Sequence, residues 1–254
     1  MTDTLSQYSV LALYSAMAIY AIAFVLFTLD LAKGASDDSA AVGEANKVVV
    51  VPERRKLARV AMALTVIGFL LQLAATVMRG LAASRVPWAN MYEFAMTGTL
   101  VIVGVFLLVN LKWDMKFLGS FVTGLVLLLL GLAATRYYVE IVPLPPALQS
   151  YWLVIHVFVA TLATGFFALG FALSLMQLLQ GKRESAVAAG EKTRLAFLTR
   201  LPDSVQLENF AYRLIIIGFV LWTFTLIAGA IWAEKAWGRY WGWDTKEVWT
   251  FIIW

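Results

Sequence analysis

Six stretches of this sequence are strongly apolar, carry few charges and are about 20 residues long or longer, the length a helix needs to cross a bilayer. Inside lipid every backbone polar group must be hydrogen-bonded internally, so such stretches fold as helices. We therefore predict an all-α fold, a polytopic membrane bundle of six full spans and the start of a seventh. The predicted spans are residues 9–32, 59–82, 94–112, 117–135, 151–179 and 211–233, with the last beginning near Val248.

Composition supports a single transmembrane domain over residues 1–254. The chain is 61% apolar, whereas soluble domains average about 45–50%. It contains no cysteine, which excludes disulfides, iron–sulfur clusters, thiolate metal sites and a cysteine nucleophile. The N-terminal segment lacks the basic region of a cleavable signal peptide, so we expect the first apolar run to be retained. Since the sequence stops a few residues into the seventh run, we expect the natural domain to continue.

The distribution of basic residues predicts the orientation. Fourteen of the 20 Lys and Arg residues fall in one set of loops, and loops rich in Lys and Arg face the cytoplasm. The minority set, placed outside with the N-terminus, is Arg79, Arg85, Arg136, Lys235, Arg239 and Lys246. The basic residues flank the spans, so orientation explains the pI near 9.3 and no nucleic-acid partner is expected. We predict a multi-pass protein of the plasma membrane, in contact with lipid.

His156 is the only histidine, and it lies about five residues inside the outer end of the fifth span. Ionisable groups inside spans are costly and often functional. A lone imidazole at the edge of an apolar environment suits an axial ligand of haem iron. A neutral histidine hydrogen-bonded to a neighbouring helix explains the same pattern, and residue chemistry alone leaves both interpretations open.

An outer loop, residues 234–248, is rich in tryptophan. Six of the ten tryptophans lie between Trp232 and Trp254. An aromatic belt at the membrane interface is one explanation. The other is a shelf for a flat, apolar, anionic molecule such as haem, with indole faces for the ring, glycines for close approach and basic residues for carboxylates. The candidate cofactor-binding residues are His156, Trp237, Gly238, Arg239, Tyr240, Trp241, Gly242, Trp243, Asp244 and Trp249.

A second outer loop, "SRVPWANMYEFAM", precedes the third span. Asn90 followed three residues later by Glu93 predicts a helix N-cap. Polar contacts of Asn90, Tyr92 and Glu93 with a ligand in a shared outer site are the alternative.

Three motifs carry a family resemblance. "WGRYWGWDTKEVW" resembles the WWD signature of the haem-handling proteins of cytochrome c maturation. "VPWANMYEF" in an early outer loop and "SYWLVIHV" at the start of a later span, in that order, are similar to the CcsA/ResC family, labelled CcsB in actinobacteria. The resemblance covers most of the chain from about Val86 onward.

The resemblance implies a membrane subunit of the system II cytochrome c synthase, a haem lyase complex. Such a subunit holds haem b at the outer face between two external histidines and presents it to the CxxCH motif of apocytochrome c for thioether attachment. His156 matches the first histidine, and Trp237, Trp241, Trp243 and Asp244 match the haem-contacting loop. The implied partners are a ResB-type membrane protein, apocytochrome c and, indirectly, thiol-reducing proteins. No histidine follows His156, so we expect the second ligand beyond Trp254.

Two other functions fit the sequence less well. A CcmC-type haem exporter or chaperone shares the WWD loop but hands haem to a carrier; the number of spans and the "PWANMYEF" loop favour CcsA. A non-haem membrane subunit of a respiratory or transport complex would need charged groups in mid-span, which are scarce here.

Overall fold

The computed structural model describes residues 2–41, 56–142, 149–191, 198–199 and 201–254. Within them the chain is helical and contains no strand, which confirms the all-α prediction. Six of the described helices are long and apolar enough to cross a membrane. The elements are α1 (Thr2–Ala41), α2 (Lys56–Ala83), α3 (Met91–Lys112), the 3-10 turn η1 (Lys116–Leu118), α4 (Gly119–Arg136), α5 (Tyr151–Ala188), α6 (Ser204–Trp237) and α7 (Thr245–Ile253).

Several helices extend beyond the predicted spans. α5 continues nine residues past its predicted end at 179, and α6 begins seven residues before position 211. Hydropathy marks the part of a helix that lies in hydrocarbon, whereas the helix itself ends where its backbone is capped. The start of α6 is held by Glu184 of α5, whose carboxylate accepts hydrogen bonds from the Ser204 amide at 3.1 Å and the Ser204 hydroxyl at 2.5 Å.

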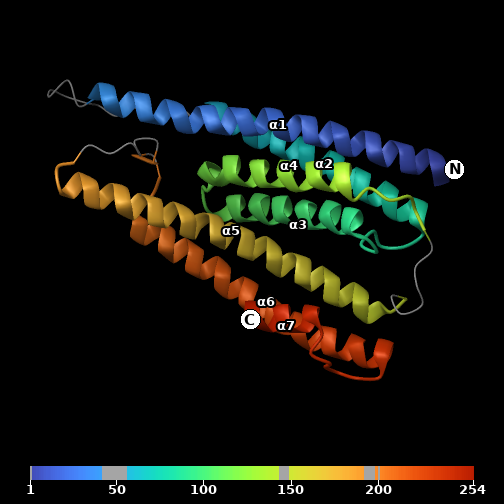
Figure 1. The fold of residues 1–254 in the computed structure, drawn as a ribbon. Helices are drawn as coiled ribbons and strands as arrows, with labels where there is room; N and C mark the ends of the chain where they lie inside the picture. The colour runs from blue at the N-terminus through green and yellow to red at the C-terminus, as the bar shows by residue number, and fades with distance from the viewer. Residues whose placement is uncertain (1, 42–55, 143–148, 192–197, 200) are drawn as a thin grey trace.

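The helices form an elongated bundle in which α1 lies along α2 and packs against α4, α3 packs on α4 and α5, and α5 lies along α6 (Figure 1). The core between them is apolar, with buried polar side chains that bond across helices. Tyr20 of α1 donates to the Gln72 side-chain oxygen of α2 at 2.9 Å, and the Gln72 amide donates to Thr99 of α3 at 2.8 Å. Such bonds join helices in membranes, where unpaired polar groups are costly.

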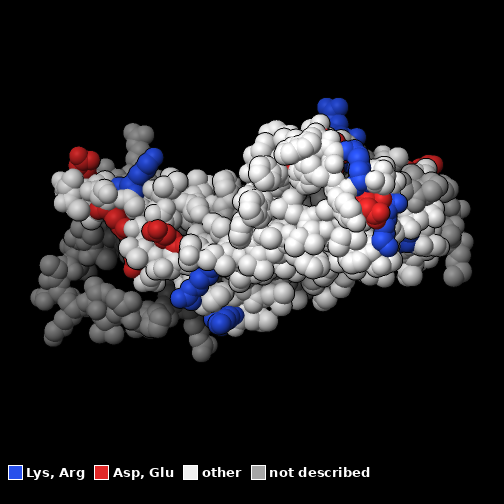
Figure 2. Space-filling model, turned by 90° about the horizontal axis from the view of Figure 1, so that it is seen from below, with Lys and Arg blue, Asp and Glu red and all other residues white. Residues whose placement is uncertain are grey.

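The N-terminus, the α2–α3 turn, the start of α5 and the α6–α7 loop lie at the same end of the bundle (Figure 1). We call it the outer end, after the orientation expected from the basic residues. Figure 2 shows charged side chains gathered towards the two ends, with an uncharged belt between them. This arrangement matches a protein whose middle lies in lipid and brings the three sequence motifs together at one end.

Candidate functional site

The imidazole of His156 is oriented by the neighbouring helix. Its Nδ1 lies 3.0 Å from the backbone carbonyl oxygen of Thr225 in α6. A carbonyl oxygen only accepts, so Nδ1 carries the proton and donates, and Nε2 keeps a free lone pair. Gly229 makes room for the ring, because a Cβ there would lie 2.8 Å from the His156 Cε1 atom. The arrangement presents one imidazole nitrogen as a metal ligand or a hydrogen-bond acceptor.

Tryptophan rings flank this imidazole. The ring of Trp232 stacks on His156 with centroids 6.2 Å apart and planes 19° from parallel. Trp237 meets Trp232 edge-on at 4.7 Å. These contacts build an aromatic wall that runs from α5 to the end of α6.

Two hollows meet at His156, Trp232 and Lys246. The smaller, about 100 Å³, lies between α6, the Trp-rich loop and α7. The larger, about 740 Å³, lies between the α2–α3 turn, the start of α5 and Trp232. Ligand pockets usually measure about 300–1,000 Å³, so only the larger hollow has room for a porphyrin.

The structure brings half of the predicted site residues together. His156, Trp237, Tyr240, Trp241 and Asp244 all line the smaller hollow. Among the described residues that line the two hollows, five predicted ones do not occur, namely Gly238, Arg239, Gly242, Trp243 and Trp249.

The two loop glycines have local structural roles. Gly238 ends α6 in the left-handed conformation, with φ of 69°, and its N–H donates to the Glu234 carbonyl oxygen at 2.7 Å. This is a common helix ending that favours glycine. Gly242 lies directly beneath the Arg239 guanidinium, where a Cβ would overlap it. The close approach at Gly242 is therefore to a side chain of the loop itself.

Asp244 has a second role as the N-cap of α7. Its carboxylate accepts from the Glu247 amide at 2.9 Å, while the Glu247 carboxylate accepts from the Asp244 amide at 3.1 Å and the Gly242 amide at 2.7 Å. This reciprocal capping box satisfies amides at the start of the helix. It also explains why α7 begins three residues before the predicted Val248.

Trp243 and Trp249 are 70% and 60% exposed, respectively. Trp243 has a left-handed backbone, with φ of 57°, which is uncommon for a residue other than glycine. It meets Trp241 edge-on at 5.7 Å. The loop conformation therefore presents the Trp243 ring to the surroundings rather than to His156.

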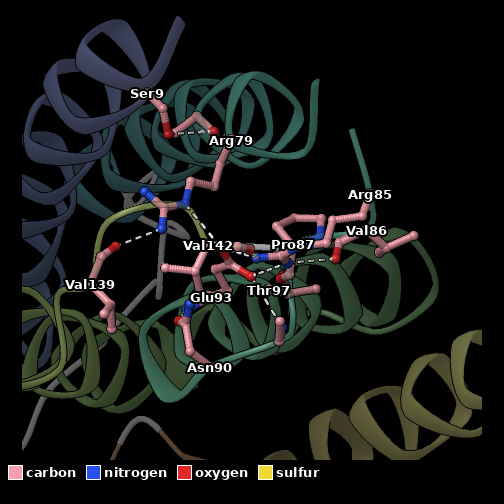
Figure 3. Close-up of polar contacts among 12 residues, drawn as sticks. Ser9, Arg79, Arg85, Val86, Pro87, Asn90, Glu93, Thr97, Val139 and Val142 are labelled. Carbon is pink, nitrogen blue, oxygen red and sulfur yellow. Dashed lines mark hydrogen bonds and ion pairs between the residues drawn. The ribbon is translucent and has the colours of Figure 1, made fainter. Parts of the chain in front are cut away.

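The α2–α3 turn contains a cluster of buried charges (Figure 3). Asn90 caps α3 by accepting from the Glu93 amide at 2.9 Å, which confirms the predicted cap. The buried Glu93 carboxylate accepts from Arg79 Nε at 3.1 Å, Arg85 Nη1 at 2.6 Å and the Ala89 amide at 3.1 Å. Arg79, which the sequence analysis assigned to a loop, lies inside α2 and is fully buried.

A family described as Cytochrome C assembly protein matches residues 88–254. The chain belongs to the cytochrome c assembly protein family. The match includes α3, α5, α6, the Trp-rich loop and α7. It therefore covers the residues that line both hollows, apart from Ala83, Ser84, Arg85 and Val86.

Curated relatives match a similar share of the chain. The protein named Cytochrome c biogenesis protein CcsA from Trieres chinensis is 31% identical over 69% of this chain and 64% of its own length. Proteins of the same name from Prochlorococcus marinus and Synechococcus are 33% and 30% identical, over 70% and 75% of this chain and 63% and 69% of their own lengths. The chain thus spans less than two thirds of the length of the first relatives it matches.

Sequence reasoning identified His156 but missed its supports. Thr225 acts through its backbone oxygen, which no side-chain pattern reveals. Gly229 contacts the His156 ring directly, but a single glycine in an apolar span does not by itself predict such a contact. The pairing of Arg79 with Glu93 also had a signal, since opposite charges lie near the joined ends of two antiparallel helices.

Proposed function

We propose that this protein binds haem b at the outer membrane face and presents it to the CxxCH motif of apocytochrome c. His156 ligates the iron through Nε2, and the porphyrin occupies the larger hollow beside Trp232. The observation that carries this proposal is the Nδ1 hydrogen bond to the Thr225 carbonyl. Histidines that bind metals commonly donate the N–H of their other ring nitrogen to a carboxylate or a backbone carbonyl, which orients the ring and raises its basicity.

The hollow supports the same function. Its walls include Trp88, Leu153, Val157 and Trp232, which offer apolar and aromatic surface to a flat ring. The Trp-rich loop, residues 234–248, lines the smaller hollow together with His156. A single imidazole comes from these 254 residues, so a second histidine ligand would have to come from outside them.

In this proposal the chain contributes position rather than reactive groups. Each thiol of the apocytochrome adds across a haem vinyl group, so that S–H and C=C become a thioether and no atom is lost. The chain has no thiol of its own. Holding the vinyl groups near the two thiols supplies proximity and orientation.

The proposed setting is the plasma membrane, with the Trp-rich loop on the extracytoplasmic side. A ResB-type membrane protein is the proposed partner, and thiol-reducing proteins keep the apocytochrome cysteines reduced. The complex would act as a system II synthase. The names and alignments of the CcsA relatives support assignment to cytochrome c biogenesis.

An absorption spectrum of the purified protein tests the proposal. We expect a Soret band from co-purified or added haem, and we expect His156→Ala to lower haem affinity at least tenfold and to shift the band, because the iron loses an axial ligand. Phe158→Leu, at an exposed position two residues along α5, is the matched control and should keep the wild-type spectrum.

A Soret band that is the same in wild type, Phe158→Leu and His156→Ala would remove His156 as a ligand. In cells, His156→Ala should strongly reduce covalent haem on c-type cytochromes, whereas Phe158→Leu should match wild type. If mature cytochromes form at wild-type levels without this protein, the proposed function is wrong.

A further inference from the structure

The charged residues around the larger hollow have one sign. Of the described residues that line it, the charged ones are Arg85, from the α2–α3 turn, and Lys246, from α7. No aspartate or glutamate lines it among those residues. A hollow with cations on separate elements and no lining carboxylate favours an anionic ligand, since an enclosed site strengthens the local potential.

The buried cluster behind Arg85 adds to this potential. Arg79 and Arg85 share one counter-ion, Glu93, so the three side chains together carry one excess positive charge. Arg79 Nη1 and Arg85 Nε are buried and have no hydrogen-bond partner within the part of the chain that the structure describes. The Arg85 side chain lines the hollow and is 10% exposed, while its Nη1 and Nη2 donate to the Glu93 carboxylate at 2.6 Å and 3.3 Å.

Lys246 stands at the junction of the two hollows. It lines both of them together with His156 and Trp232, and it is exposed. Its ammonium group is therefore able to reach a ligand that touches the imidazole. Arg239, which the sequence suggested as a carboxylate partner, lies over Gly242 and lines neither hollow.

We infer that Arg85 and Lys246 bind the two carboxylates of the porphyrin ligated by His156, one from each side of the larger hollow. This inference rests on the proposed function and assigns the orientation of its ligand. The porphyrin edge with the carboxylates lies towards these cations, so the opposite edge, which carries a vinyl group, points away from them. Charge-assisted hydrogen bonds from Arg and Lys to carboxylates are stronger than neutral ones and fix this orientation.

Three porphyrins separate the contributions in titrations of the full chain in detergent. Haem has carboxylates and iron, haem dimethyl ester has iron without carboxylate charge, and protoporphyrin IX has carboxylates without iron. We expect wild type to bind haem at least tenfold more tightly than the ester, and Arg85→Gln and Lys246→Gln each to reduce this preference. Loss of a hydrogen bond to a charged group costs about 1.5–3 kcal/mol, which corresponds to roughly tenfold or more in affinity.

Matched variants keep the test interpretable if Arg85→Gln folds poorly. Lys246→Gln changes an exposed side chain, and Arg85→Lys keeps the charge and should retain part of the preference. Lys116→Gln, near the opposite end of the bundle, where Lys116 pairs with the exposed Asp114, should bind all three porphyrins like wild type. Protoporphyrin IX should lose affinity in Lys246→Gln but not in His156→Ala.

The outcomes separate the two proposals. Equal affinities for haem and its ester in wild type, or an undiminished preference in Lys246→Gln and in folded Arg85→Gln, would overturn the carboxylate assignment while leaving ligation by His156 in place. Loss of the preference in Arg239→Gln alone would also overturn it, in favour of the loop arginine. Haem binding that does not depend on His156 would overturn the proposed function instead.

Discussion

The two sides of the outer site are held in different ways. The α2–α3 turn is fixed by buried side chains that bond across distant parts of the chain, such as Arg79 to Glu93 and to the Val139 carbonyl oxygen. The α6–α7 loop is held by hydrogen bonds between residues at most five positions apart, and indole contacts attach α7 to α6. We expect the first side to be a rigid frame and the second to open at low cost, because local units unfold most easily.

The largest expected effect is on the rigid side. Glu93→Gln removes the counter-ion of Arg79 and Arg85, and breaking a buried ion pair costs about 3–5 kcal/mol. We therefore expect a clear fall in the thermal unfolding midpoint in detergent. Asp114→Asn, which removes an exposed ion pair with Lys116, is the control and should cause little or no change. A Glu93→Gln protein as stable as the control would show that the cluster does not hold the frame.

An intermediate effect is expected between the two sides, at the imidazole. A Cβ at Gly229 would lie 2.8 Å from His156 Cε1 and 3.0 Å from Nδ1, so Gly229→Ala should displace the ring from the Thr225 carbonyl. Overpacking of this kind costs about 1–3 kcal/mol, and we expect haem affinity to fall by roughly 10- to 100-fold.

Gly131→Ala is the matched control for Gly229→Ala. A Cβ at Gly131 in α4 would meet no atom within 4 Å, and both changes share the same gain in helix propensity. The difference in haem affinity between the two variants therefore isolates the clash. Equal affinities would mean that the ring does not need the space at Gly229.

The smallest effect is expected on the local side. Asp244→Ala removes the N-cap of α7, a loss of about 0.5–2 kcal/mol, whereas Asp244→Ser retains a capping oxygen. We expect faster amide hydrogen exchange within α7, by roughly 2- to 30-fold, with little change in global unfolding. A fall in global stability as large as that of Glu93→Gln would contradict the contrast between the two sides.

Much of the fold could be predicted from the sequence, because six apolar stretches each met the length that a membrane requires. Helix ends were less predictable. α5 and α6 continue beyond the lipid part, as the bond from Ser204 to Glu184 illustrates, and such contacts leave no signal in hydropathy. The capping motifs at Asn90 and Asp244 are different, because a cap is a local pattern of residue types.

The site was predictable in part for a similar reason. His156 is conspicuous because it is the only histidine and lies in an apolar span. The tryptophans indicated the loop from residue type alone. Residue type did not predict that Trp241 lines a hollow with His156 while Trp243 is exposed, because the direction of the Trp243 ring depends on its left-handed backbone. Arg85 and Lys246 were recognised as basic, yet only the folded chain places them around one hollow.

The bond between His156 and the Thr225 carbonyl has an evolutionary consequence. Because the acceptor belongs to the main chain, a substitution at position 225 that fits the buried site changes the side chain but keeps the carbonyl oxygen that fixes the imidazole tautomer. A shift of α6 along α5 would move the Thr225 carbonyl away from His156 and remove this hydrogen bond, even with no residue changed. Insertions or deletions between these two helices should therefore be tolerated only where they leave the register of the helix pair unaltered.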